Sequence, residues 1–200
     1  LVFAAKMGEN KIMSAFIFKS AKYDNDQSTI ELNYGYVEGP TFKEVIHFPN
    51  AKSELTSTEQ DALDKAIRQL HLAAGISYYK AYCPKEIIVE NEALSQEEAD
   101  FFYKFYLMGL GEFSVENNIQ LKDIISFPIG TSKTLSPSDL KLTSASVVPI
   151  GGGKDSIVSL EALIQANHPL RMIAINAGKP IKDVMEVAQP IQAIHIKRTL

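Results

Sequence analysis

The sequence predicts an α+β N-terminal domain over residues 1–135, followed by the start of an α/β parallel-sheet domain over residues 143–200. Three observations predict this organisation. Short β-rich runs come first, two amphipathic helices follow, and strands alternate with helices from residue 145. The chain has no initiator Met and stops just after a predicted strand, so we expect a truncated fragment of a longer protein.

The first domain begins with an expected antiparallel meander. Three partly alternating β-rich runs cover residues 14–22, 29–37 and 42–48. The turn-forming segments Asp-Asn-Asp at 24–26 and Glu-Gly-Pro at 38–40 separate them. Short connections of this kind join neighbouring antiparallel strands.

Two helices and a strand are expected next. Thr56 and Glu59 form a candidate capping box, and apolar residues recur at helical spacing until Gly75, the predicted stop. A strand is possible at residues 86–90. A second capping box, Ser95 with Glu98, precedes an aromatic helix expected to reach about residue 117. Two glycines interrupt that helix, at positions 109 and 111, so a break or close packing is expected there.

The second domain shows a βαβαβ order after a segment, residues 130–139, that has little to bury and is the expected linker. The expected strands cover residues 145–150, 170–175 and 191–196, and the expected helices cover 156–167 and 180–189. The strands are nearly continuous apolar runs, which is typical of parallel strands covered on both faces. Ile157, Leu160 and Ile164 are expected to pack on them.

The most informative motif lies between the first of these strands and its helix. It reads Gly151-Gly152-Gly153-Lys154-Asp155-Ser156. Glycines let a ligand approach the backbone, and a helix N-terminus offers N–H groups to an anion, so nucleotide phosphate is the expected ligand. A Walker A loop would need Gly at position 148 and Ser or Thr at 155, but the sequence has Val148 and Asp155 there. A dinucleotide fingerprint would need Gly at position 156, which is Ser156. The sequence therefore excludes the first motif and disfavours the second.

The motif resembles the PP-loop of ATP pyrophosphatases, Ser-Gly-Gly-x-Asp-Ser, at five of its six positions, Gly151 being the departure. The resemblance implies an adenine nucleotide α-hydrolase-like domain that splits ATP to AMP and pyrophosphate. The glycines would admit the phosphates, Ser156 would bond them, Lys154 would lie near transferred charge and Asp155 near Mg²⁺. In the alternative interpretation, the segment is only a tight turn, with Lys154 solvated and Asp155 capping the helix.

Three segments together are similar to the ATP-dependent UDP-N-acetylmuramoyl-L-alanyl-L-glutamate epimerase family of peptidoglycan synthesis. They are residues 75–80 (GISYYK), 107–113 (LMGLGEF) and 149–156 (PIGGGKDS). The resemblance covers residues 70–200 and implies ATP and Mg²⁺ as cofactors and the UDP-muramoyl dipeptide as substrate. Activation of the glutamate carboxylate as an acyl-adenylate would make its α-proton removable by a modest base. Two alternatives stay open: another PP-loop enzyme, amidotransferase-like or tRNA-modifying, and a non-catalytic nucleotide-binding protein.

Further candidates carry competing interpretations. Tyr78, Tyr79 and Lys80 suit substrate contacts, but such tyrosines are as often core residues. Glu112 is a candidate base, or a solvated helix charge. The four histidines show no metal spacing, and Cys83 is expected to be a buried thiol.

Composition narrows the partners and the compartment. Lys and Arg number 20 against 24 Asp and Glu, a net charge of −4, which disfavours nucleic acid or an anionic membrane as a partner. No run approaches the roughly 20 apolar residues that span a bilayer. With a single cysteine, we expect a cytoplasmic protein.

Overall fold

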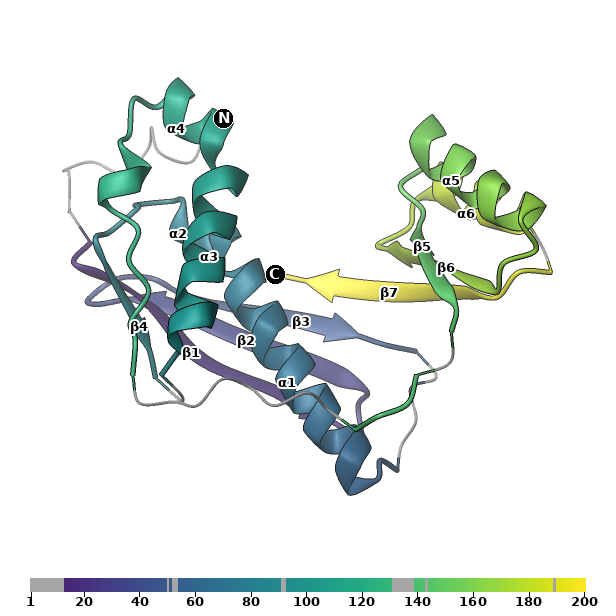
Figure 1. The fold of residues 1–200 in the computed structure, drawn as a ribbon, viewed down its shortest axis with the longest axis horizontal. Helices are drawn as coiled ribbons and strands as arrows, with labels where there is room; N and C mark the ends of the chain where they lie inside the picture. Colours follow the sequence, from purple (N-terminus) through teal and green to yellow (C-terminus); the bar gives the residue numbers. More distant parts are fainter. Residues whose placement is uncertain are drawn as a thin grey trace. The chain divides into compact units, whose positions relative to one another are not determined.

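The protein has a mixed α/β fold in a computed structural model (Figure 1). The structure describes residues 13–49, 51, 54–90, 93–130, 139–142, 144–188 and 190–200. It divides into two compact units. The first unit consists of residues 1–22, 31–44 and 60–138. The second unit consists of residues 23–30, 45–59 and 139–200. The domain limits 1–135 and 143–200 stay a prediction, and residues 131–138 of the expected linker lie outside the described part.

The strands of the first unit follow the order β4-β1-β2-β3. The predicted meander is formed by β1 (Ala15–Asp24), β2 (Thr29–Tyr36) and β3 (Thr41–His47). The possible strand at 86–90 is confirmed as β4 (Glu86–Val89), which runs parallel to β1. A parallel partner requires a long crossover, and the helices between β3 and β4 provide it.

Both predicted capping boxes are confirmed. α1 (Ser57–Ala74) begins after Thr56, whose N–H donates to Glu59 Oε2 at 2.8 Å while its Oγ1 accepts from the Glu59 N–H at 3.3 Å. Ser95 and Glu98 make the same exchange before α3 (Gln96–Gly109). The predicted interruption separates α3 from α4 (Gly111–Glu116). The remaining short helices are α2 (Ile76–Tyr79) and the 3₁₀ turn at Leu121–Asp123.

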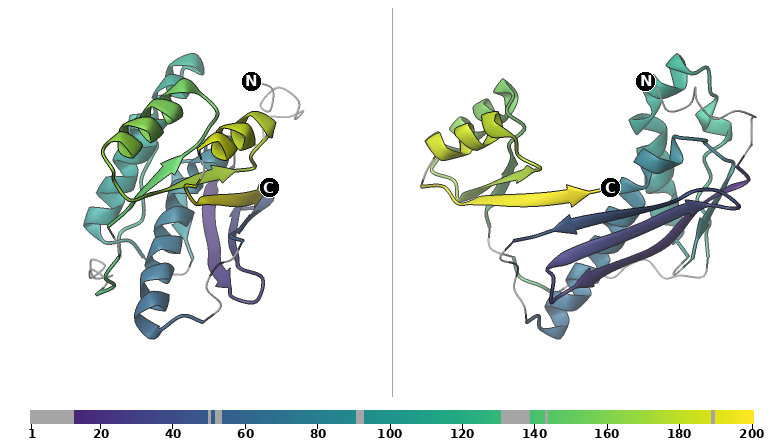
Figure 2. Two further views of the ribbon diagram at one scale, coloured as in Figure 1. Left: turned by 90° about the vertical axis from the view of Figure 1, so that its right-hand side faces the viewer. Right: turned by 180° about the vertical axis from the view of Figure 1, so that it is seen from behind.

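The core of the first unit is aromatic. Helices α1 and α3 cover one face of its sheet (Figures 1 and 2), and Phe16, Phe18 and Tyr34 from the sheet are fully buried with Tyr79 and Tyr106 from the helices. Buried tyrosine hydroxyls are bonded here: those of Tyr34 and Tyr106 donate to the carbonyls of residues 71 and 72, at 3.1 and 2.8 Å. These bonds satisfy carbonyls at the end of α1.

The predicted βαβαβ order of the second unit is confirmed. It comprises β5 (Ser146–Pro149), α5 (Lys154–Gln165), β6 (Leu170–Ile175), α6 (Lys179–Val187) and β7 (Ala193–Thr199). The three strands are parallel, in the order β5-β6-β7. In the same unit, residues 45–47 of β3 pair antiparallel with β7. Helix α5 begins two residues earlier than expected, directly after the three glycines.

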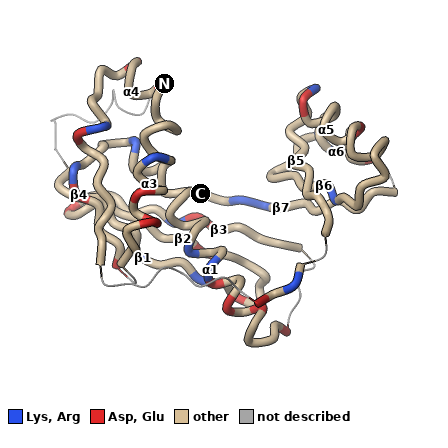
Figure 3. The backbone as a smooth tube through the Cα atoms, viewed as in Figure 1, with Lys and Arg blue, Asp and Glu red and all other residues tan. Residues whose placement is uncertain are grey.

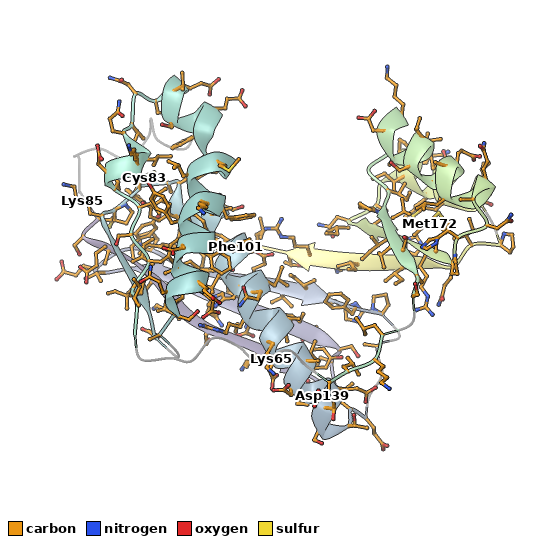
Figure 4. The ribbon with its side chains drawn as sticks, viewed as in Figure 1. Lys65, Cys83, Lys85, Phe101, Asp139 and Met172 are labelled. Carbon is orange, nitrogen blue, oxygen red and sulfur yellow. The ribbon has the colours of Figure 1, made fainter. Side chains whose placement is uncertain are left out.

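One packing expectation for this unit is confirmed only in part, and another is not met within the described residues. Of the predicted helical face, Leu160 is buried and Leu163 packs beside it, but Ile157 and Ile164 are exposed. The strands are also not covered on both faces within the described residues, because both helices lie on the side of Met172 (Figures 2 and 4). Two right-handed crossovers that advance in the same direction place their helices on the same face.

Charges of both signs are interspersed along α1 (Figure 3), where Lys65 pairs with Asp61 at 2.7 Å. Among the described residues, no helix combines the length and the apolar character that a membrane crossing requires.

Candidate functional site

The glycine turn lies between the carboxyl end of β5 and the start of α5. Gly152 has φ +79°, in the left-handed region that favours glycine. A Cβ on Gly152 would also meet Ile181 Cγ1 at 3.2 Å, whereas a Cβ on Gly151 or on Gly153 would have nothing within 4 Å. The conformation and packing of the turn therefore explain Gly152 and leave open space beside the other two glycines.

Helix α5 presents an uncapped N-terminus at this turn. Its N-cap residue is Gly153, which makes no side-chain cap bond to the first turn. The N–H groups of a first helical turn have no intrahelical partner, and the helix dipole adds partial positive charge there. Lys154 and Asp155 are both exposed in this first turn. The arrangement can hold an anion with backbone donors and one ammonium group.

Ser156 is half-buried and already bonded within the helix. Its hydroxyl donates to the Gly153 carbonyl at 2.8 Å. A contact from this hydroxyl to a phosphate oxygen therefore requires the hydroxyl to rotate away from that carbonyl. Asp155 uses its backbone carbonyl to accept from the Ser159 hydroxyl at 2.9 Å, so its carboxylate is not needed for that bond.

A second turn, at the carboxyl end of β6, lies beside the first, as the approach of Ile181 to Gly152 shows. Asn176 there has φ +49° and binds the backbone of Arg198 twice, accepting from its N–H and donating to its carbonyl at 2.8 Å each. Gly178 is the N-cap of α6 and makes no side-chain cap bond. Sequence reasoning missed this turn, although Asn-Ala-Gly-Lys-Pro after an apolar run repeats the strand, glycine, lysine order of the first.

The three predicted substrate residues belong to the first unit and differ from one another. Tyr79 is fully buried, its hydroxyl donates to the Pro84 carbonyl at 3.1 Å, and burial raises its pKa. Tyr78 is half-buried and stacks on Tyr34 with ring centroids 4.6 Å apart. Lys80 is exposed. Tyr79 is thus a core residue, and Tyr78 and Lys80 retain accessible surface.

Glu44 is a buried carboxylate that the sequence reasoning missed. It is 1% exposed and accepts a hydrogen bond from the Tyr78 hydroxyl at 2.9 Å. A signal was available, because Phe42, Glu44 and Ile46 alternate along β3 and so share the helix-covered face. A buried acid is costly unless it is bonded, so the Tyr78 hydroxyl stabilises it.

The remaining histidine, cysteine and glutamate candidates include two buried side chains and one exposed one. His71 is buried, its Nε2 lies 3.0 Å from the Asn33 carbonyl, and burial lowers its pKa. Cys83 is buried, as expected, and burial raises its pKa to about 11. Glu112 is exposed. In the described part of the chain, His, Cys, Asp and Glu side chains form no group of three or more placed to hold a metal ion.

These features define a mixed α/β protein with an open glycine turn between a parallel strand and a helix N-terminus. The chain belongs to the family described as the MurL N-terminal domain, which matches residues 7–200.

Three curated relatives share the name UDP-N-acetyl-alpha-D-muramoyl-L-alanyl-L-glutamate epimerase. The protein of Xanthomonas oryzae pv. oryzae (strain MAFF 311018) is 33% identical over 89% of this chain and 42% of its own length. That of Micromonospora sp. (strain ATCC 39149 / NRRL 15099 / SCC 1413) is 33% identical over 88% of the chain and 40% of its own length. That of Salinispora tropica is 29% identical over 94% of the chain and 42% of its own length. The chain thus spans about two fifths of these relatives, and no solved structure matches it.

Proposed function

We propose that this chain is the N-terminal part of an ATP-dependent isomerase of peptidoglycan precursor synthesis. Its reaction would invert the terminal L-glutamate of UDP-N-acetylmuramoyl-L-alanyl-L-glutamate. Membership of the MurL N-terminal domain family and three relatives named as epimerases support the substrate and the reaction class. We further propose that β5, α5, β6, α6 and β7 begin a PP-loop, adenine nucleotide α-hydrolase-like domain.

The observation that carries the nucleotide proposal is the open space beside Gly151 and Gly153. The fold needs no glycine at these two positions, so a ligand that approaches the backbone gives their presence a reason. The uncapped start of α5 fits a phosphate group, since its N–H groups can donate to phosphate oxygens. Lys154 would neutralise phosphate charge, and Ser156 would exchange its bond to Gly153 for one to a phosphate oxygen. Asp155 would be the ligand for Mg²⁺, which prefers carboxylate oxygen.

The chemistry of the substrate explains why ATP is needed. Beside an ionised carboxylate the α-proton of glutamate is very weakly acidic, because its loss places a second negative charge on adjacent atoms. Conversion of that carboxylate to an acyl-adenylate, with release of pyrophosphate, removes this obstacle and lets a general base act at the α-carbon. Hydrolysis then yields AMP and the D-glutamyl product. In the first unit, Tyr78 and Lys80 are the proposed substrate contacts.

The test is an assay of the full-length protein with ATP, Mg²⁺ and the UDP-muramoyl dipeptide, following AMP and the configuration of the glutamate freed from the product by acid hydrolysis. We expect AMP and D-glutamate. A Gly151→Val variant is expected to lose both while keeping its melting temperature, because the new side chain enters the open space of the turn. Gly111→Val is the matched control, since a Cβ on Gly111 also meets nothing within 4 Å.

The other outcomes assign different functions. AMP without inversion would keep the nucleotide proposal and replace the substrate, as for another PP-loop enzyme. Full activity of Gly151→Val would remove the glycine turn from nucleotide binding. Absence of AMP with the dipeptide intact would contradict the enzyme proposal and favour a non-catalytic nucleotide-binding protein.

A further inference from the structure

One face of the β5-β6-β7 sheet is apolar and exposed. Residues in register on parallel strands point to the same side of a sheet, and successive residues alternate. Met172 and Ala174 pack under α5 and α6, so Arg171, Ile173 and Ile175, which alternate with them along β6, point the other way. We call this side the open sheet face; its apolar residues are Val147, Pro149, Ile173, Ile175, Ile194 and Ile196.

The exposure is largest on β5 and β6. Val147 is 55% exposed and Ile175 is 54% exposed, while Ile173 and Ile194 are half-buried. Ile196, next to Ile175 on β7, is buried, so the exposure falls from β5 and β6 toward that end of β7. None of these residues belongs to the buried cluster under α5 and α6 or to the residues packed against it. Arg171, in register with Val147, adds one exposed positive charge to this face.

The composition of this face is not that of a surface in contact with water. In the first unit, the sheet face away from the helices carries Glu31, Asn33 and Lys43, and the Lys43 ammonium pairs with the Glu31 carboxylate. The open sheet face carries isoleucine and valine instead of such charged and amide side chains. Parallel strands of this composition occur almost only in sheets covered on both faces, and exposed apolar patches mark interaction surfaces.

We infer that, in the full-length protein, the open sheet face is covered by amphipathic helices from the part of the chain that follows this one. The length of the relatives supports this occupant, because the chain spans only 40–42% of each. The matched family is an N-terminal domain, so the remaining length follows it. Both helices of the βαβαβ unit already occupy the other face, and in doubly wound sheets the second face is covered by helices from the other half of the fold. A carboxylate on the covering helix would face Arg171.

Cysteine labelling of the native full-length protein tests this inference. Ile175→Cys and Val147→Cys place a thiol on the open sheet face, and Val187→Cys, at a position 88% exposed on α6, is the matched control. We expect maleimide to modify the first two at least tenfold more slowly than the control. The native Cys83 thiol is buried and its pKa is about 11, so it contributes little to the background.

Two results would overturn the inference. Labelling of both face positions at the rate of Val187→Cys would show that nothing covers the face. Protection that disappears on dilution, together with a change of mass from dimer to monomer, would assign the face to a second copy. The circular dichroism spectrum of each variant identifies one that has unfolded, and the second face position then decides. Because no nucleotide is present, failure here is distinguishable from failure of the proposed reaction.

Discussion

Gly75 in the first unit and Gly151 in the second differ in what surrounds them. A Cβ on Gly75 would lie 2.3 Å from Phe18 Cε1 and 2.9 Å from the Tyr106 hydroxyl oxygen. A Cβ on Gly151 would meet nothing within 4 Å. The packing of the first unit therefore requires Gly75. No described residue requires a glycine at position 151. Close packing marks a scaffold, and open backbone marks a surface available to a ligand.

The largest loss of stability is expected from adding a methyl group at Gly75, where the core has no space for it. Gly75→Ala should destabilise the protein by about 3 kcal/mol, since overpacking of a core typically costs roughly 1–3 kcal/mol and the nearest atoms belong to buried rings. Chemical denaturation measures this change. Gly111→Ala, in open space, is the control. A loss below about 0.5 kcal/mol for Gly75→Ala would mean that the core relaxes easily.

A smaller loss of stability is expected from Tyr78→Phe. The variant removes the donor to the buried Glu44 carboxylate, and hydrogen bonds to charged groups contribute about 1.5–3 kcal/mol. Tyr79→Phe removes a donor to a neutral carbonyl, and such bonds contribute about 0.5–1.5 kcal/mol. The difference between the two unfolding free energies is the measurement. Equal losses would show that Glu44 does not rely on Tyr78.

The helix ends of the first unit show which features the sequence could predict. The capping boxes, Thr56 with Glu59 and Ser95 with Glu98, were predictable because each depends on residues three positions apart. Gly75 was predicted as a helix stop, and α1 does end before it, but its φ is −54°, in the right-handed region. Its actual requirement is the approach of Phe18, a contact across 57 positions of sequence that no local pattern contains.

In the candidate site, too, the sequence predicted the contiguous features and missed those that depend on strand pairing. The strand, three glycines and helix were recognised because they are contiguous. The neighbouring turn at Asn176 was missed, since its bonds to Arg198 depend on the pairing of β6 with β7. The apolar strands correctly indicated a parallel sheet. They could not indicate that both helices lie on one face, which depends on the strand order β5-β6-β7.

A pH-dependent effect is expected from His71 in the first unit. Burial lowers its pKa below the ordinary 6.5, so the unfolded chain binds a proton more readily than the folded one. The stability contributed by the neutral ring is present above about pH 6.5 and is lost as the pH falls from there through the folded pKa. Denaturation curves between pH 7 and pH 5 measure this. His71→Gln should flatten the decline, and an unchanged slope in this variant would contradict the role of His71.

The smallest effect on stability is expected from a substitution at Gly151, and its comparison with Gly152 tests the role of the open space. Gly151→Ala should change the free energy of unfolding by less than about 0.5 kcal/mol, because its Cβ would enter open space. Gly152→Ala should cost about 1–2 kcal/mol, since alanine at φ +79° adopts a strained left-handed conformation. Urea denaturation of the two variants provides the measurement. Equal stabilities would show that the turn relaxes, and a costly Gly151→Ala would give Gly151 the same packing role as Gly75.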